Sequence, residues 1–139
     1  MASDTDAIVA RHYMGAYGPT LLLITRTHGH LEILRGHFEK LARGQSPAIR
    51  IVAGGPWEFD GLAELAMETV EHALPGARRA GDPRTHDVRI EWRMARDGWE
   101  HCLWLLDGLV TTGEPGHQYL TEERDDRVLV VLSFREYRR

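Results

Sequence analysis

The chain has 139 residues, 42% of them hydrophobic and 27% charged, and carries a formal net charge of −4. This composition is ordinary for a folded domain, which excludes a disordered or collagen-like chain, and the negative balance disfavours nucleic acid as a partner. Its apolar runs, such as Leu103 to Leu106, are far shorter than the ~20 residues of a membrane span, and a single cysteine is typical of a reducing cytoplasm.

The N-terminal part of the chain predicts a short helix followed by a strand. Ser3 and Asp6 have the spacing of a helix N-cap and its capping box, so we expect a helix from there through Tyr13. Gly18 and the proline after it would end this helix. The apolar run 21–25, bounded by turn residues, predicts a strand. The acidic start lacks the apolar segment that is typical of a signal peptide.

A longer helix and a second strand follow. Apolar residues at helical spacing mark one face of this helix: Leu31, Leu34, Phe38, Leu41 and Ala42. Arg43 and Gly44 are typical of a helix C-terminus. Residues 48–53 predict a strand that Gly54-Gly55-Pro56 ends. These glycines lack a phosphate-binding motif, so we interpret them as a plain turn.

The segment 61–74 is open to two interpretations. Its apolar residues match a helical stripe, and because Ala and Glu are poor strand residues we favour a helix. A strand with Leu65, Met67 and Thr69 on one face remains the alternative. Residues 75–87 predict a solvated loop, and we interpret its arginines (78, 79 and 84) as solvated too.

The second half of the chain gives clearer signals. Residues 88–94 alternate apolar and charged side chains, which predicts a strand with one wet face. Asp97 and Glu100 have capping-box spacing and predict a helix that Gly113 ends. Residues 128–132 are apolar on both faces, as in a central strand that is covered on both sides.

This order of elements favours an α+β fold. We expect a two-layer α/β sandwich with a mixed sheet of four to five strands, related to the split βαβ arrangement. Right-handed crossovers would place the two main helices on one face of the sheet. We expect a single globular domain over residues 1–139, located in the cytoplasm. The second face of the last strand would be covered by the N-terminal helix, the 61–74 segment or a partner subunit.

The chain has eight histidines, which makes metal binding the first chemistry to consider. His28, His30 and His37 lie at the start of the 29–42 helix and along one side of it. However, a zinc site needs three or four converging ligands, and neither H-E-x-x-H nor paired C-x-x-C occurs. We therefore expect surface histidines and no metal or other cofactor.

Other reactive side chains are better explained by the fold. Cys102 lies on the apolar face of its helix, about 100° away from His101, so we expect a core residue and not a nucleophile. Glu64, Glu68 and Glu71 form an acidic stripe, which we interpret as the solvated side of a helix and not as an acid–base pair. No catalytic residue is predicted.

The segment 113–120 has more specific side chains than a connection between a helix and a strand requires. His117, Gln118 and Tyr119 place an imidazole, an amide and a phenol close together, and we predict that they bind a ligand or partner. In the alternative interpretation, His117 and Gln118 cap the preceding helix while Tyr119 and Leu120 pack beneath the sheet.

The last third of the chain also carries a resemblance. Its helix from Gly98-Trp99-Glu100, the run Pro115-Gly116-His117-Gln118-Tyr119-Leu120, and Asp125-Asp126 before an apolar strand resemble small uncharacterised α/β proteins of GC-rich bacteria. In size and style the chain is similar to immunity proteins of bacterial polymorphic toxin systems. This resemblance implies a small stand-alone protein and brings no catalytic residues with it.

Two functions from different classes follow. The first is a non-enzymatic module that binds a protein partner or a second copy of itself, as an immunity-type inhibitor binds its toxin. Trp57 and Trp99, near element ends, would anchor that interface. The second is a small enzyme or ligand-binding protein with a pocket around His117 and Tyr119, joined by His28 or His30. A perturbed histidine in a concave apolar pocket would favour the second function.

Overall fold

A computed structural model describes residues 7–16, 18–71, 76–80, 88–121 and 127–136 of the chain. These residues form an α+β structure with two helices and nine strands. The helices are α1 (His28–Ala42) and α2 (Arg96–Thr112). The strands are β1 (Ile8–Gly15), β2 (Gly18–Thr25), β3 (Ala48–Val52), β4 (Trp57–Asp60), β5 (Glu64–Thr69), β6 (Gly76–Ala80), β7 (Arg89–Met94), β8 (Gly116–Tyr119) and β9 (Leu129–Phe134).

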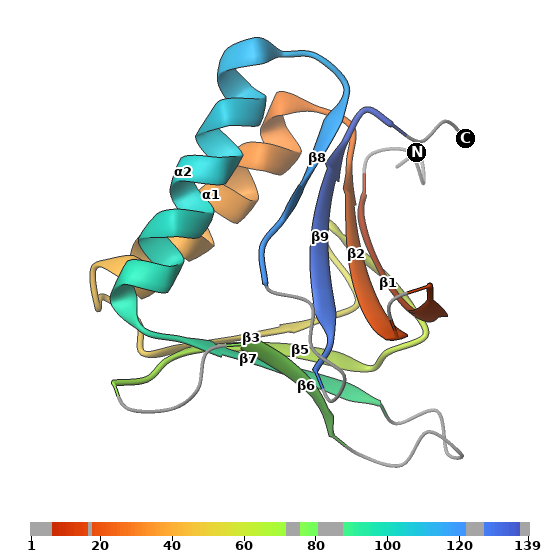
Figure 1. Ribbon diagram of the computed structural model, residues 1–139, viewed down its shortest axis with the longest axis vertical. Helices are drawn as coiled ribbons and strands as arrows, with labels where there is room; N and C mark the ends of the chain where they lie inside the picture. Colours follow the sequence, from red (N-terminus) through yellow and green to blue (C-terminus); the bar gives the residue numbers. More distant parts are fainter. Residues whose placement is uncertain (1–6, 17, 72–75, 81–87, 122–126, 137–139) are drawn as a thin grey trace.

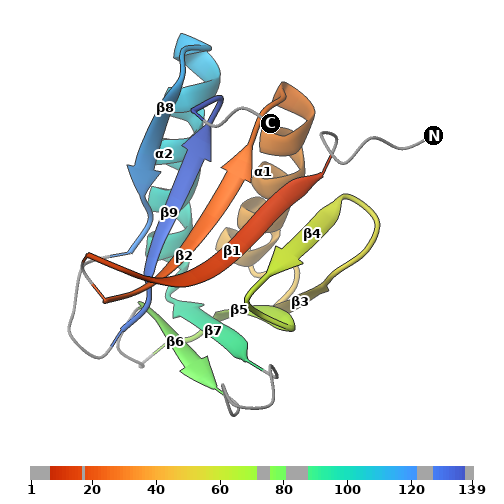
Figure 2. The same ribbon diagram turned by 90° about the vertical axis from the view of Figure 1, so that its right-hand side faces the viewer.

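The strands form two mixed sheets, where the sequence predicted one. The five-stranded sheet has the order β4-β1-β2-β9-β8, and the four-stranded sheet has the order β3-β5-β7-β6. The four-stranded sheet lies across one end of the five-stranded sheet, and α1 and α2 pack together in the angle between them (Figure 1). Each helix connects the two sheets, because α1 leads from β2 to β3 and α2 from β7 to β8. The predicted crossovers within one sheet are therefore wrong, although both helices lie on the same side of the five-stranded sheet (Figure 2).

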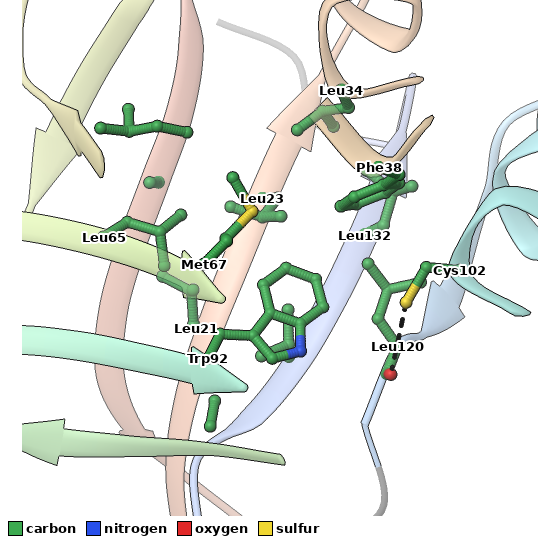
Figure 3. Close-up of a cluster of buried hydrophobic side chains, with 14 of the residues drawn as sticks. Leu21, Leu23, Leu34, Phe38, Leu65, Met67, Trp92, Cys102, Leu120 and Leu132 are labelled. Atoms are coloured by element: carbon green, nitrogen blue, oxygen red, sulfur yellow. Dashed lines mark hydrogen bonds between the residues drawn. The ribbon is translucent and has the colours of Figure 1, made fainter. Parts of the chain in front are cut away.

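One large hydrophobic cluster fills this angle and receives side chains from both sheets and both helices (Figure 3). Leu21 of β2, Met67 of β5 and Trp92 of β7 are at most 1% exposed. Phe38 of α1 places its ring 5.7 Å from that of Trp92 and 5.8 Å from that of Trp99 on α2. Burial of this shared apolar surface is the main force that holds the sheets and helices together.

Both main helices are confirmed, because their predicted apolar faces are the ones turned to the cluster. The chain leaves α1 at Arg43, and Gly44 follows with a φ of 72°. Gly113 ends α2 in the left-handed conformation, as its position predicts. The predicted cap at Asp97 is wrong, since the N-cap is Ala95. Asp97 lies instead in the first turn, where a carboxylate favours the helix dipole.

The four predicted strands are also present, as β2, β3, β7 and β9. In β7 the alternation is as expected: Ile90 and Trp92 are fully buried, while Arg89 is exposed. The last strand, β9, lies between β2 and β8 and is therefore an interior strand of its sheet. The expected cover on both of its faces is wrong for the described residues, because Leu129 and Val131 line an open depression on the outer face.

The predicted N-terminal helix is wrong where the structure describes it, because residues 8–15 form β1. Ile8 and Ala10 face the core and alternate with Val9, and the strand pairs with β2 from Val9 to Gly15. The glycines that would end a helix instead close a hairpin at the Gly15–Gly18 pair, with Gly18 at a φ of 97°. Pairing with an apolar neighbour thus overrides the local helix signal. Ser3 and Asp6 lie outside the described residues.

The favoured helix over residues 61–74 is also wrong, since residues 64–69 form β5. Leu65 and Met67 point into the core, as in the alternative that we left open. The glutamates that argued against a strand are stabilised there by cross-strand ion pairs, Glu64 with Arg50 and Glu68 with Arg93. Residues 72–74 lie outside the described residues.

Three short strands, β4, β6 and β8, were not predicted. Four or five residues give too little alternation to be recognised in a sequence. Strand β6 falls within the segment predicted as a loop, and its Arg78 pairs with Glu91 of β7 at 3.0 Å. The rest of that loop, including Arg84, lies outside the described residues.

Candidate functional site

The outer face of the five-stranded sheet, which points away from the helices, is the surface on which the predicted site lies (Figure 2). The register of β8 on β9 places His117 opposite Ser133 and Tyr119 opposite Val131. Strand β2 continues the second row, because Val131 lies opposite Leu22. His117, Tyr119, Val131 and Leu22 therefore share this face.

These side chains surround an open depression of about 330 Å³, which we call the Tyr119 depression. Its floor is formed by partly or fully buried residues of β2 and β9, and its rim by residues of β1 and β8 and by Glu136, which follows β9. The described lining residues are Tyr13, Gly15, Ala16, Thr20, Leu22, His117, Tyr119, Leu129, Val131 and Glu136. Tyr13 and Tyr119, on opposite sides, are 41% and 54% exposed. The depression thus combines an apolar floor with an aromatic and polar rim.

A chain of polar contacts occupies one side of this rim. His117 Nδ1 lies 2.9 Å from Glu136 Oε2, and the Ser133 hydroxyl donates to Glu136 Oε1 at 3.0 Å. The Tyr119 ring lies edge-on to the His117 ring, with centroids 5.5 Å apart. With its proton on Nδ1, the imidazole donates to the carboxylate and keeps Nε2 as an acceptor.

Glu136 reaches this position because the chain turns sharply after β9. Arg135 has a φ of 59°, the single positive φ of a described residue other than glycine, and such a conformation needs support from its surroundings. Its backbone N–H donates to Thr25 O at 2.9 Å, its side chain donates to Arg26 O and Gly113 O at 3.3 Å, and its guanidinium lies 4.8 Å from the ring centre of Phe134. These contacts hold the turn that brings Glu136 back over the sheet.

Gln118 does not share this site. Since side chains alternate along a strand, Gln118 of β8 points toward the helices. It lines a second depression, of about 360 Å³, beside the exposed Trp104 of α2. The predicted trio is thereby divided between two faces, and neither His117 nor Gln118 has a described hydrogen bond to the end of α2.

Neither predicted tryptophan anchor is accessible. Trp99 is fully buried, and its Nε1 donates to Glu68 O at 3.2 Å. Trp57 is 7% exposed and lies against Phe59 and His37. Trp104, which the sequence did not single out, is 70% exposed. Trp104 lies outside the apolar stripe of α2, and this position in the sequence could have indicated that its side chain is exposed.

The histidines of α1 do not join the Tyr119 depression. His28 lies 5.7 Å from the ring of Phe134, on the helix side of the sheet. His30 is buried, against our expectation of a surface residue, and its Nδ1 accepts from the Arg26 N–H at 3.0 Å. Burial lowers the pKa of His37, and the charge of Lys40 adds to this effect.

Cys102 is a core residue, as predicted. It is fully buried, and burial raises the pKa of its thiol to about 12, so the nucleophilic thiolate is absent at neutral pH. Of the three carboxylates predicted to form a solvated helix stripe, Glu64 and Glu68 lie on β5 and pair with arginines, and Glu71 follows the strand. Gly54 bridges to Trp57 in a tight turn, as the sequence indicated.

One titratable group at the junction of the two sheets was not predicted. His12 lies on the inner side of β1, and burial together with the nearby charge of Arg79 lowers its pKa. A hydrogen bond with the Gly61 backbone raises the pKa in part, but the net shift is downward. Its Nε2 is buried and has no hydrogen-bond partner among the described residues. No local sequence pattern indicates the hydrogen bond between His12 and Gly61, because it depends on how β1 meets the turn between β4 and β5.

The described residues contain no cluster of three or more His, Cys, Asp or Glu side chains that could hold a metal ion. Neither described helix is both long and apolar enough to cross a membrane. Comparison of the chain with protein-family models, with curated protein sequences and with solved structures gives no match.

Proposed function

We propose that this chain is a non-enzymatic binding module whose protein partner docks on the outer face of the five-stranded sheet, over the Tyr119 depression. The observation that carries this proposal is the pair of exposed tyrosines, Tyr13 and Tyr119, on either side of an apolar floor. Tyrosine is enriched at the centres of protein interfaces, because its ring offers a large contact area and its hydroxyl a hydrogen bond.

The shape of the site supports a macromolecular partner. Small-molecule sites are usually deep clefts that bury most of their ligand. The Tyr119 depression is instead open, at the lower end of the volume range of such clefts, and extends across several strands. A surface of this form suits one or two side chains that project from a larger partner.

The form of this function that we favour is an immunity-type inhibitor, which acts by covering a toxin. The small α+β chain, with a net charge of −4, suits a protein that acts through surface contact. The one cysteine of the chain, Cys102, is buried in the core and does not line the depression.

The test is native mass spectrometry of the chain isolated gently from its own host, with matched variants. We expect a second protein in stoichiometric amount with the wild type and with Trp104→Ala, an exposed aromatic outside the depression. Tyr119→Ala and Tyr13→Ala should each lose that protein while retaining wild-type stability. Retention of the partner by both tyrosine variants, or a homodimer or bare monomer in every sample, would overturn the proposal.

A second candidate function rests on the His117–Glu136 pair. A carboxylate that holds Nδ1 leaves Nε2 as an acceptor, as in catalytic dyads, which favours a small enzyme or ligand-binding protein. His117→Ala should then abolish ligand binding or turnover while the chain still folds. A small molecule in the native spectrum that His117→Ala removes would move this function ahead of protein binding.

A further inference from the structure

We infer that the Tyr119 depression accepts an arginine side chain of the partner, with its methylenes on the apolar floor and its guanidinium between Glu136 and the Tyr119 ring. This inference rests on the proposed function and specifies the chemistry of the partner. It draws on the shape of the depression, its charge and the way in which Glu136 is held.

The shape fits a long side chain with an apolar stem. Leu22 and Val131 lie opposite each other at the centre of the floor, and Tyr119 is the next residue of the same row. The carboxylate of Glu136 lies beside His117 and Ser133, which form the neighbouring row. An arginine stem buries its methylenes along apolar surface while its charged end reaches a polar group.

The charge of the depression favours a cation. Glu136 is the one acidic residue among the described lining residues. Although the chain has seventeen Lys and Arg residues, none of them is a described lining residue. Arg11, which lies opposite Leu22 on β1, is held by Asp60 of β4 at 2.9 Å. A partner cation therefore meets a carboxylate here without a competing arginine.

The carboxylate is positioned before any partner arrives. Its two oxygens contact the Ser133 hydroxyl and the His117 ring, and the left-handed turn at Arg135 fixes the backbone. Glu136 remains 30% exposed, so it can still accept from a partner. Because its rotamer is already set, binding costs less side-chain entropy.

A guanidinium matches these groups better than an ammonium does. It is planar, stacks on aromatic rings and donates through several N–H groups in a fixed geometry, to a carboxylate among others. Tyr119 has no described hydrogen bond, and its exposed ring lies on the same rim as Glu136. A lysine would satisfy the charge but would gain less from the ring.

The test is a titration of the full chain with N-acetyl-arginine amide, followed by NMR. The matched neutral probe is the citrulline analogue, which replaces the guanidinium by a urea, and the matched cation is N-acetyl-lysine amide. Glu136→Gln removes the charge but keeps groups that can bond to Ser133 and His117. Glu100→Gln removes an exposed carboxylate of α2, outside the depression.

We expect saturable shifts of the Tyr119, Leu22 and Val131 resonances with the arginine probe and much weaker ones with either other probe. Glu136→Gln should weaken binding about tenfold, since a charge-assisted hydrogen bond is about twice as strong as a neutral one. Glu100→Gln should leave it unchanged. Equal binding of the citrulline or lysine probe, or shifts centred on Glu100, would overturn the inference.

The inference and the proposed function can fail separately. If the arginine probe does not bind but Tyr119→Ala still loses its partner protein, the arginine assignment is wrong and the docking face stands. If the probe binds as expected but no partner depends on the two tyrosines, the proposed protein-binding function is wrong, and the inference about its partner falls with it.

Discussion

The two sheets of this fold cover the same core but turn different faces to the outside. The outward side chains of the four-stranded sheet pair across strands as Arg50 with Glu64, Arg93 with Glu68 and Arg78 with Glu91. The five-stranded sheet turns apolar Leu22 and Val131 outward, beside exposed tyrosines. Charges that pair within the chain need no partner, whereas an apolar floor with an aromatic rim gains from one. The contrast identifies which of the two surfaces serves for binding.

The largest effects on stability are expected in the core that both sheets share. Trp92→Ala and Trp99→Ala should each lower the free energy of unfolding by about 3–5 kcal/mol. The phenylalanine variants sharpen this comparison, because Trp99 Nε1 donates to Glu68 O while Trp92 Nε1 has no partner among the described residues. Trp99→Phe should therefore cost about 1 kcal/mol more than Trp92→Phe. Urea denaturation measures all four, and equal costs for the two phenylalanine variants would contradict the hydrogen-bond assignment.

The turn between the two sheets should also be sensitive. Gly61, between β4 and β5, has a φ of 81°, and a Cβ added there would lie 2.4 Å from His12 O. Gly61→Ala combines backbone strain with a clash and should cost more than about 2 kcal/mol. Gly18 is the matched control, because its φ is 97° but nothing lies within 4 Å of an added Cβ. Gly18→Ala should cost about 1 kcal/mol in the same denaturation experiment, and an equal loss in both variants would argue against the clash.

The two outer faces can be compared directly by removing one side chain from each. Leu22 is 5% exposed at the centre of the apolar face, so Leu22→Ala should cost about 2 kcal/mol. Arg93 lies on the charged face with pairing distances of 3.5 and 3.9 Å to Glu68 and Glu91. Arg93→Ala should cost less than about 1 kcal/mol, since partly exposed ion pairs contribute little. A larger loss for Arg93→Ala would reverse the energetic ranking of the two faces.

A smaller effect, on pH dependence, is expected where the sheets meet. Burial lowers the pKa of His12 and of His37 below the ordinary value of 6.5, and the cations Arg79 and Lys40 add to this shift. The unfolded chain therefore binds protons more readily, so these histidines reduce stability progressively as pH falls below about 6.5. Their contribution is fully restored above that pH.

The His12→Gln/His37→Gln double variant tests this effect. Urea midpoints at pH 7 and pH 5 should differ less in the variant than in the wild type, because glutamine does not titrate. The same pH dependence in both proteins would show that neither histidine is destabilised by protonation.

The elements that sequence patterns predict here are those with a long, one-sided apolar stripe. Both helices and the alternating strand β7 were predictable, since each carries its own periodicity. Strands β1 and β5 were assigned to helices because their strand state depends on neighbours distant in sequence, namely β2 for Ile8–Gly15 and the arginines of β3 and β7 for Glu64 and Glu68. The division into two sheets likewise follows from pairing that no local pattern encodes.

The candidate site was predicted only where it lies on one short segment. His117 and Tyr119 were predicted because the segment 113–120 has more polar and aromatic side chains than a connection between a helix and a strand requires. Gln118 was grouped with them because β8 was taken as a loop, in which alternation does not apply. Tyr13 and Glu136 reach the depression through the β1–β2 hairpin and the turn after β9, which become visible only once the strands are paired.

The most direct test of the central claim is hydroxyl-radical footprinting of the complex isolated from the native host, compared with the free chain. Docking on the outer face of the five-stranded sheet predicts slower oxidation of Tyr13 and Tyr119, both exposed in the free chain, and an unchanged rate at Trp104. Protection of Trp104 with no change at the two tyrosines would place the partner on α2 and contradict the account.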